Sequence, residues 1–548
     1  MKPVTAFRAV FLGVVIGAIG AVVAPGGAAF AQTNSDQAPA GGRGRGSRSA
    51  DTSGPWFGVP LPPPFGKEPA VIVGSRAPLP FVMPSGEAAS PELAGAAIRK
   101  DVDALVAIAT ESRSSREVGG SGQLWGRIAG LPSGIKTAEW AAAQWRAAGI
   151  ADVRVQPFGQ EANSTFWFPL SWEVRLLGGD ALGPNSRDVV LESALPVTPS
   201  LISGGTLTAP LVYVGDGSPS VLQHIDVKGK IAVQLVIPQG HMLFERELVA
   251  DHSRDLLKRG AAGVFNLVRL PGNEYSHDYS NCGNPCFNIG GRDGAFLENV
   301  LNRAAEKNVE VRAQIKLAAE NKTNLKGENA VAVIAGANTN EVLIIDAHFD
   351  SWFDGAGDNA GGFAVMMALA KHFAKPANKP GRTLVFIASA GHHSPGLNGL
   401  TNFNRENADL VKKAILGMNI EHVAQRNFSP ARTTAPDGYR QAIADSGEAP
   451  AYAGVSNASP YLDGLMQQGV TRYGVNFISE KSPIGSGETG GLMGINGAKV
   501  TIIQAPPLYH TTGEVADMIS TPGLERMARF LSYFITDVAR APLKQINP

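Results

Sequence analysis

Apolar positions recur with two different periods along this chain. Between residues 91 and 150 they are spaced as on amphipathic helices, in ELAGAAIRKDVDALVAIA and TAEWAAAQWRAAG, and the strand-like DVRVQPF follows. From about residue 329 short apolar runs alternate with helical stretches, in VAVIAG, EVLIIDAHFD, RTLVFIASAG, AILGMNIEHV and KVTIIQAPP. This alternation predicts an α/β fold with a mostly parallel, mixed sheet flanked by helices.

The stretch between these two parts, residues 205–320, has a different texture. It carries short β-rich runs, APLVYVGDG and GKIAVQLVI, followed by GVFNLV. We therefore expect a β-rich inserted domain here, so that the main domain is discontinuous and consists of residues 91–204 and 325–543.

The amino-terminal residues resemble a secretory signal. Lys2 and Arg8 precede an apolar run that ends near Val23, and the small-residue sequence AFA follows. This pattern predicts a signal peptide over residues 1–31 and a secreted or periplasmic protein. A membrane anchor is the alternative, but the apolar run is short and is followed by the breaker PGG. Residues 32–90, rich in Gly, Pro and Arg, are predicted to be a flexible leader.

The charge balance of the chain argues against two classes of partner, nucleic acids and membrane surfaces. The 48 Lys and Arg residues balance 48 Asp and Glu residues, so no global positive field favours nucleic acid or, after signal cleavage, a membrane surface.

Cys282 and Cys286 are the two cysteines of the chain, and in an exported protein their spacing favours a local disulfide over a metal-binding pair.

Metal-competent residues follow several of the predicted strands. In an open α/β sheet, the carboxyl ends of the strands form the ligand site, so side chains at these ends should meet. The residues in question are His348 after VLIIDA, His392 and His393 after LVFIASAG, Glu421 after ILGMNI, and His510 after KVTIIQAPPLY.

Three segments, HFDS, GAGDNAGGFA and YHTTGEVAD, resemble in order and spacing the metal-binding segments of the M28 peptidases, a family of zinc aminopeptidases. The segments APLVYVGDG, DVKGKIAV and GAAGVFN of the insert are similar to a protease-associated domain, which is common in that family. The resemblance implies a zinc-exopeptidase-like fold over about residues 91–543 and a peptide or small amide substrate.

The resemblance also implies a set of metal ligands. Residues that match His348, Asp358 and Glu421 hold one zinc ion in the family, where the last is normally Asp. Those that match Asp358, His393 and His510 hold a second, so that Asp358 would bridge the ions. Asp350 matches a carboxylate behind the ligands, which would accept the ring N–H of His348 and fix its tautomer.

Gly391-His392-His393 departs from the family, which usually has two adjacent glutamates here, a general base and a metal ligand. His393 can still bind zinc through a ring nitrogen. With two anionic ligands, however, two divalent ions would leave a site charge of about +2, against about +1 in the family. One ion is therefore favoured over two, held by Asp358, His393 and His510. This ligand set also occurs with non-haem iron, but the resemblance favours zinc.

His392 is the candidate general base, because an imidazole with a near-neutral pKa can take a proton from the attacking water. A nearby cation would lower the pKa of His392 and weaken that role. The leading hypothesis is therefore a metal-dependent hydrolase of amide bonds. Two alternatives stay open: a catalytically inactive binding scaffold on the peptidase fold, and a metalloenzyme with non-peptidase chemistry. The sequence does not indicate the oligomeric state.

Overall fold

The computed structural model describes residues 77–548, apart from residues 184, 239–250, 281, 283, 433–439, 458, 481–486 and 505–507. The predicted signal peptide, 1–31, and most of the predicted leader, 32–90, lie outside the described residues and stay predictions. Within the described part of the chain, no helix is both long enough and apolar enough to cross a membrane.

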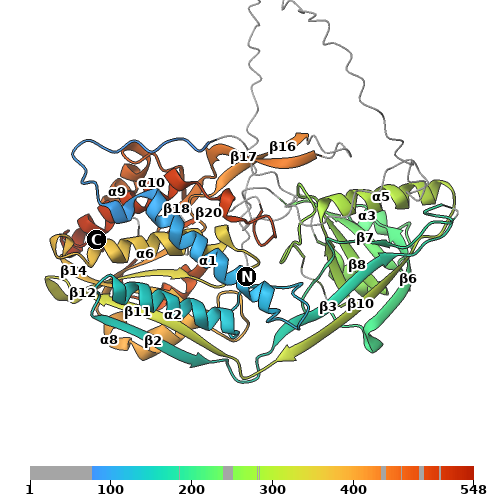
Figure 1. The fold of residues 1–548 in the computed structure, drawn as a ribbon, viewed down its shortest axis with the longest axis horizontal. Helices are drawn as coiled ribbons and strands as arrows, with labels where there is room; N and C mark the ends of the chain where they lie inside the picture. The colour runs from blue at the N-terminus through green and yellow to red at the C-terminus, as the bar shows by residue number, and fades with distance from the viewer. Residues whose placement is uncertain are drawn as a thin grey trace, which may run out of the picture. The chain divides into compact units, whose positions relative to one another are not determined.

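The main sheet has eight strands in the order β19-β18-β20-β15-β12-β14-β11-β2 (Figure 1). The central strands β14, β12, β15 and β20 run parallel, whereas β11 and β18 pair antiparallel with β14 and β20. This mixed sheet confirms the predicted fold class. Its strands are β2 (Asp152–Gly159), β11 (Lys326–Ile334), β12 (Asn338–His348), β14 (Arg382–Ser389), β15 (Ala414–Glu421), β18 (Ala451–Val455), β19 (Phe477–Glu480) and β20 (Ala498–Gln504).

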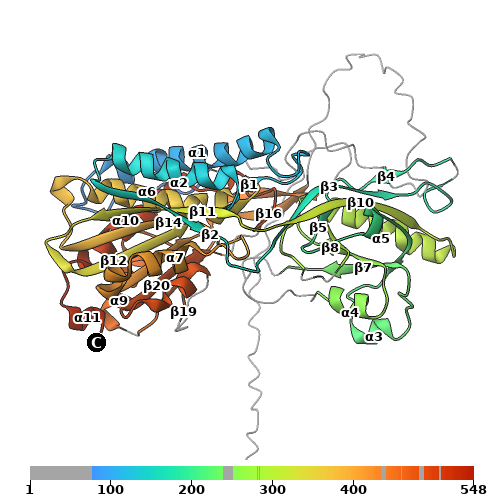
Figure 2. The ribbon, with the colours of Figure 1, turned by 90° about the horizontal axis from the view of Figure 1, so that it is seen from below.

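Helices cover both faces of the main sheet, and β12 shows how the sequence specifies this. Side chains alternate across a strand, so Leu343 and Ile345 face one layer while Val342 and Ile344 face the other. Figure 2 shows α1 and α2 on one side of the sheet and α7 on the other. The first layer contains α1 (Gly95–Ser115), α2 (Pro132–Ala147), α6 (Gly362–Phe373) and α10 (Thr521–Val538); the second contains α7 (Gly399–Glu406) and the 3₁₀ segment η5 (Gly487–Gly494).

A second eight-stranded sheet is ordered β4-β3-β10-β6-β7-β8-β9-β5. Its long strands β3 and β10 pair antiparallel along most of their length and lie side by side in Figure 1. The elements of this region are β3 (Phe166–Leu176), β4 (Val189–Val190), β5 (Leu195–Pro196), β6 (Thr206–Tyr213), α3 (Pro219–Leu222), β7 (Ile231–Val236), α4 (Ser253–Lys258), β8 (Gly263–Val268), β9 (Cys286–Ile289), α5 (Gly291–Glu306) and β10 (Arg312–Lys322).

The second sheet begins earlier than the predicted insert boundary. Because β3 pairs with β10, the sheet takes in residues from 166, and the boundary predicted at 205 falls inside it. The pairing joins segments far apart in the sequence, so local patterns do not reveal it. We use "insert" below for residues 166–322; its assignment as a protease-associated domain stays a prediction.

The remaining described elements are small and lie around the two sheets. Cys282 and Cys286 form a disulfide at the start of β9, which confirms the predicted local bridge. The short elements are β1 (Gly126–Arg127), which pairs with β13 (Ser351–Trp352), β16 (Arg426–Arg432), which pairs with β17 (Arg440–Glu448), and the helices α8 (Ala408–Lys412), α9 (Pro460–Thr471) and α11 (Leu543–Ile546).

Candidate metal centre

Four imidazoles surround the carboxylate of Asp358, which lies between β12 and α6. Asp358 Oδ1 is 2.8 Å from His422 Nε2 and 3.2 Å from His348 Nε2. The second oxygen, Oδ2, is 2.6 Å from His510 Nε2 and 2.9 Å from His393 Nε2. None of the five side chains is more than 9 % exposed. We call these five residues the Asp358 cluster.

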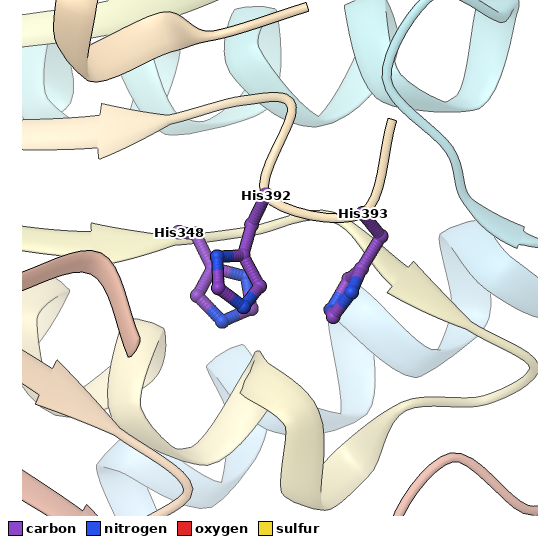
Figure 3. A group of neighbouring side chains, drawn as sticks. All are labelled: His348, His392 and His393. Atoms are coloured by element: carbon purple, nitrogen blue, oxygen red, sulfur yellow. The ribbon is translucent and has the colours of Figure 1, made fainter. Parts of the chain in front are cut away.

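The carboxyl ends of four neighbouring parallel strands build this cluster. His348 ends β12, and the other three histidines follow β14, β15 and β20. Four of the five predicted metal ligands, His348, Asp358, His393 and His510, are therefore brought together. Figure 3 shows His348, His392 and His393 projecting into the same space from two of these strand ends.

His422 is a member of the cluster that the sequence did not predict. Side chains of consecutive residues in a strand point to opposite faces, so Glu421 and His422 are not expected to share a site. His422 lies just beyond β15 and has a left-handed backbone, with φ of 51°, which breaks this alternation. Its position after an apolar strand was the available signal.

Glu421, the fifth predicted ligand, lies at the edge of the cluster. Its Oε1 is 3.8 Å from His348 Nε2 and accepts the backbone N–H of Glu488 at 2.8 Å. Burial raises its pKa, and its Oε2 is buried with no hydrogen-bond partner among the described residues. It can thus donate an oxygen to a cation, and its role as a ligand stays a prediction.

Asp350 has a different partner from the one expected. The ring nitrogen Nδ1 of His348 is 3.2 Å from the backbone carbonyl of Asp350 and 3.8 Å from its carboxylate. The carboxylate instead accepts the backbone N–H groups of Gly391, His392 and His393, at 3.2, 3.3 and 2.8 Å. The carboxylate of Asp350 therefore holds the histidine loop, and its backbone carbonyl is the group within hydrogen-bond distance of His348 Nδ1.

His392 does not touch Asp358 but stacks on His348, with ring centroids 4.3 Å apart and planes 24° apart. Its Nδ1 lies 2.9 Å from Glu488 Oε1. Burial alone would lower the pKa of His392, but the Glu488 carboxylate raises it well above its usual value. The sequence did not predict Glu488, because η5 contacts β15 only through tertiary packing.

The described side chains fit a divalent metal ion. The atoms of His348, Asp358 and His422, and those of Asp358, His393 and His510, form two groups of potential ligands that share Asp358. Burial lowers the pKa of His348 and of His393, which favours the neutral imidazole that binds metal. Both of their Nε2 atoms are buried without a hydrogen-bond partner among the described residues. Imidazoles and a carboxylate are also the donors that zinc prefers.

The insert reaches this centre. Asp278 Oδ2 lies 2.9 Å from His510 Nδ1, on the opposite side of the ring from Asp358. Burial would lower the pKa of His510, but its hydrogen bonds to the two carboxylates raise it to about 9. Asp278 carried no motif or period in the sequence that pointed to this contact.

A cavity of about 460 Å³ opens beside the centre. His392 and His393 line it together with side chains of the insert, Trp167 and Asp278 among them, and Glu161 lies at the same cavity as an exposed carboxylate. Its lining combines apolar side chains with imidazoles and carboxylates, and concave sites of this size are typical of binding sites for small ligands.

The part of the chain that carries the Asp358 cluster is similar to a known protein family. Residues 329–535, which contain the whole Asp358 cluster, match the model of peptidase family M28. These residues belong to peptidase family M28. The family therefore accounts for the main sheet from β11 onward, while Asp278 and the insert lie outside the residues that the M28 model matches.

Solved M28-type structures share the fold of most of the chain. A peptidase M28 precursor of Shewanella amazonensis SB2B has 18 % identity and a TM-score of 0.58, and the match covers 82 % of this chain and 98 % of that one. An aminopeptidase of Aneurinibacillus sp. strain AM-1 has 21 % identity and a TM-score of 0.51, with 84 % and 97 % covered. BSAP, a zinc aminopeptidase from Bacillus subtilis, has 18 % identity and a TM-score of 0.53, with 81 % and 97 % covered.

One curated relative matches a shorter part of this chain. It is a protein of Arthroderma benhamiae with the name "Probable glutamate carboxypeptidase", 34 % identical over 120 residues. The match covers 21 % of this chain and spans only 16 % of the relative's length.

Proposed function

We propose that this protein is an exported, zinc-dependent hydrolase that cleaves amide or peptide bonds, with aminopeptidase-like activity. The observation that carries the proposal is the Asp358 cluster, in which one buried carboxylate is shared by two groups of metal-competent side chains beside a cavity. The membership of residues 329–535 in the M28 family and the zinc aminopeptidase among the similar structures support it.

In this proposal Asp358, His393 and His510 hold a single ion in the resting protein. A second ion would use His348, Asp358 and either His422 or Glu421, but few carboxylates are present to balance its charge. When bound, zinc would polarise the substrate carbonyl and make a water molecule more acidic.

His392 is the group that moves the proton. The oxygen of a water molecule bonds to the carbonyl carbon, and His392 takes a proton from that water. The carbon–nitrogen bond then breaks, and the same proton passes from His392 to the leaving nitrogen, so that an acid and an amine are released. The position of His392 at the cavity and next to His348 supports this role.

This chain has His392 and His393 at the two positions where the M28 family usually has glutamates. Glu488, from another part of the chain, brings a carboxylate next to His392. Its hydrogen bond to Nδ1 orients the ring, so that Nε2 of His392 would be the proton acceptor. The same carboxylate raises the pKa of His392, so His392 would accept a proton only at a pH high enough to leave the ring neutral. Asp350 keeps the loop in place by accepting three of its backbone amides. The hydrolase hypothesis therefore does not require a glutamate at either histidine position.

Export of the protein is part of the proposal. It is supported by the signal-like residues 1–31 and by the disulfide between Cys282 and Cys286, since such bonds persist in oxidising compartments. Cleavage of the amino-terminal segment, measured by mass spectrometry of the mature protein, tests it. A mature protein that starts at Met1 would contradict it.

A catalytically inactive binding scaffold is the second candidate, favoured by the His392-His393 pair and by the raised pKa of His392. A metalloenzyme with other chemistry would use the same imidazoles with iron or copper. Elemental analysis, combined with a chelator-controlled assay on peptides with free amino or free carboxyl ends, separates the three. About one zinc per chain with chelator-sensitive cleavage supports the hydrolase, metal-free inactive protein supports the scaffold, and bound iron or copper supports the third.

A further inference from the structure

A short segment of the insert, residues 274–279, lies along the segment that carries His510. The backbone N–H of His277 donates to the carbonyl of His510 at 2.9 Å, and Ser276 forms a β-bridge with Thr511. Tyr279 donates its hydroxyl to the carbonyl of Tyr509 at 2.7 Å. His510 is therefore held on both sides by hydrogen bonds from the insert.

Asp278 extends this contact to the imidazole itself. Its Oδ2 lies 2.9 Å from His510 Nδ1, while Nε2 of the same ring faces Asp358 at 2.6 Å. Its other oxygen, Oδ1, lies 2.8 Å from His277 Nδ1, and the His277 ring stacks on Trp352 with centroids 4.1 Å apart. Each carboxylate oxygen of Asp278 therefore lies next to one imidazole, Oδ2 next to that of His510 and Oδ1 next to that of His277.

Asp278 and His510 share an uncommon backbone conformation. Asp278 and His510 both have left-handed backbones, with φ of 59° and 51°. Residues other than glycine adopt this region uncommonly, and Asp and His do so more readily than most. Both residues lie in the two segments that the hydrogen bonds described above join.

We propose that Asp278 of the insert is a positioning residue for the metal centre, because it fixes the tautomer and the orientation of His510. The insert is then a structural part of the centre rather than a separable lid over it. This inference rests on the proposed metal-dependent function, and it concerns a residue outside the part of the chain that the M28 family model matches.

The carboxylate of Asp278 is 44 % exposed, so its replacement removes little buried structure. The test uses the full mature chain and measures zinc affinity by competition with a chromophoric chelator. Loss of such a partner of a ligating histidine typically weakens metal binding by about 10- to 100-fold, which is the range expected for Asp278→Ala. Asp278→Asn should weaken it less, because the amide oxygen can still accept the Nδ1 proton.

Two controls separate positioning from general loosening of the insert. Asp216→Asn removes an exposed carboxylate elsewhere in the insert, and Tyr279→Phe removes the bond to Tyr509 without touching the imidazole. Asp216→Asn is expected to bind zinc within about 3-fold of the wild type and to unfold at a similar temperature without metal. Tyr279→Phe removes one hydrogen bond to the His510 segment but leaves the Asp278 carboxylate at the imidazole, so it should weaken zinc binding less than Asp278→Ala does.

The outcomes are distinguishable. Wild-type affinity in Asp278→Ala would overturn the inference and leave the proposed function intact. Equal weakening in Asp278→Ala and Tyr279→Phe would also overturn it, because the effect would then come from the segment and not from the carboxylate. A wild-type protein that binds no divalent metal would remove the proposed function and the inference together.

Discussion

His392 Nδ1 lies 2.9 Å from Glu488 Oε1, and this contact links two segments that are distant in the sequence. The backbone N–H of Glu488 also donates to Glu421 Oε1 at 2.8 Å. Glu488 therefore touches both the candidate proton acceptor and a candidate metal ligand. A carboxylate at this position can orient the imidazole and stabilise its protonated form.

The first prediction concerns Glu488→Gln. We expect kcat for an aminoacyl amide to fall by about 10- to 100-fold with KM little changed, because the proton acceptor loses its orienting partner. Glu488 raises the pKa of His392, so its loss lowers that pKa. Activity that depends on neutral His392 rises with pH, and this rise should shift to lower pH in the variant.

Glu488→Asp provides the matched control for that experiment, since it keeps the charge on a shorter side chain and should restore part of kcat. Glu406→Gln, a change at an exposed glutamate of α7, should have no effect on either parameter. An unchanged pH profile in Glu488→Gln would show that Glu488 does not set the protonation of His392.

Asp358→Asn should abolish metal binding. All four imidazoles of the cluster face the two oxygens of this carboxylate, and an amide neither carries the charge nor offers a second oxygen. We expect the bound zinc, measured by elemental analysis after dialysis, to fall below about a tenth of the wild-type content. Asp409→Asn, at an exposed position of α8, should keep the full content, and retention of zinc in Asp358→Asn would exclude Asp358 as a shared ligand.

The strand ends of the main sheet could be predicted because parallel strands place their carboxyl ends at one edge. The apolar runs before His348, His393 and His510 were therefore enough to place these residues together, and the motif around Asp358 supplied the carboxylate. The fold class followed from the same alternation of strands and helices.

Other features of the centre depend on tertiary contacts that leave no local pattern. Asp278 contacts His510 because residues 274–279 lie along the segment of His510. The second sheet begins before the predicted boundary at residue 205 because β3 pairs with β10. His422 was not predicted because consecutive side chains of a strand point to opposite faces, and the left-handed backbone of His422 interrupts this alternation. Local periodicity carries information about neither pairing nor backbone reversals.

Glu161 provides a test of which end of a peptide enters the cavity. Its exposed carboxylate lies at the cavity, where it could pair with a substrate amino group. An exposed ion pair contributes about 0.2–1 kcal/mol, so Glu161→Gln should reduce the preference for a free amino end over its acetylated form by up to about 5-fold. The measurement is the ratio of inhibition constants for the two forms of one peptide.

Glu310→Gln, at an exposed position of the insert, is the control for that ratio and should leave it at the wild-type value. If Glu161→Gln also leaves the ratio unchanged, the amino group is bound elsewhere or the free carboxyl end enters the cavity. The same peptides with blocked carboxyl ends distinguish these two cases.

Glu274 makes a prediction about stability and pH. It is buried at the junction of the insert and the His510 segment, where Thr512 donates a hydrogen bond to it. Burial raises the pKa of Glu274 from 4.5 to about 7. Between these values the folded protein holds a proton that the unfolded chain has lost, so this contribution to stability declines as pH rises to about 7.

Glu274→Gln stays neutral at every pH and should not show this decline. The variant should match the wild type in urea unfolding near pH 4.5 and exceed its free energy of unfolding by up to about 3 kcal/mol near pH 8. Titrations common to both proteins cancel in the difference. A difference that stays constant between these pH values would mean that Glu274 is ionised in the folded protein throughout, and that its carboxylate is solvated or paired at this junction.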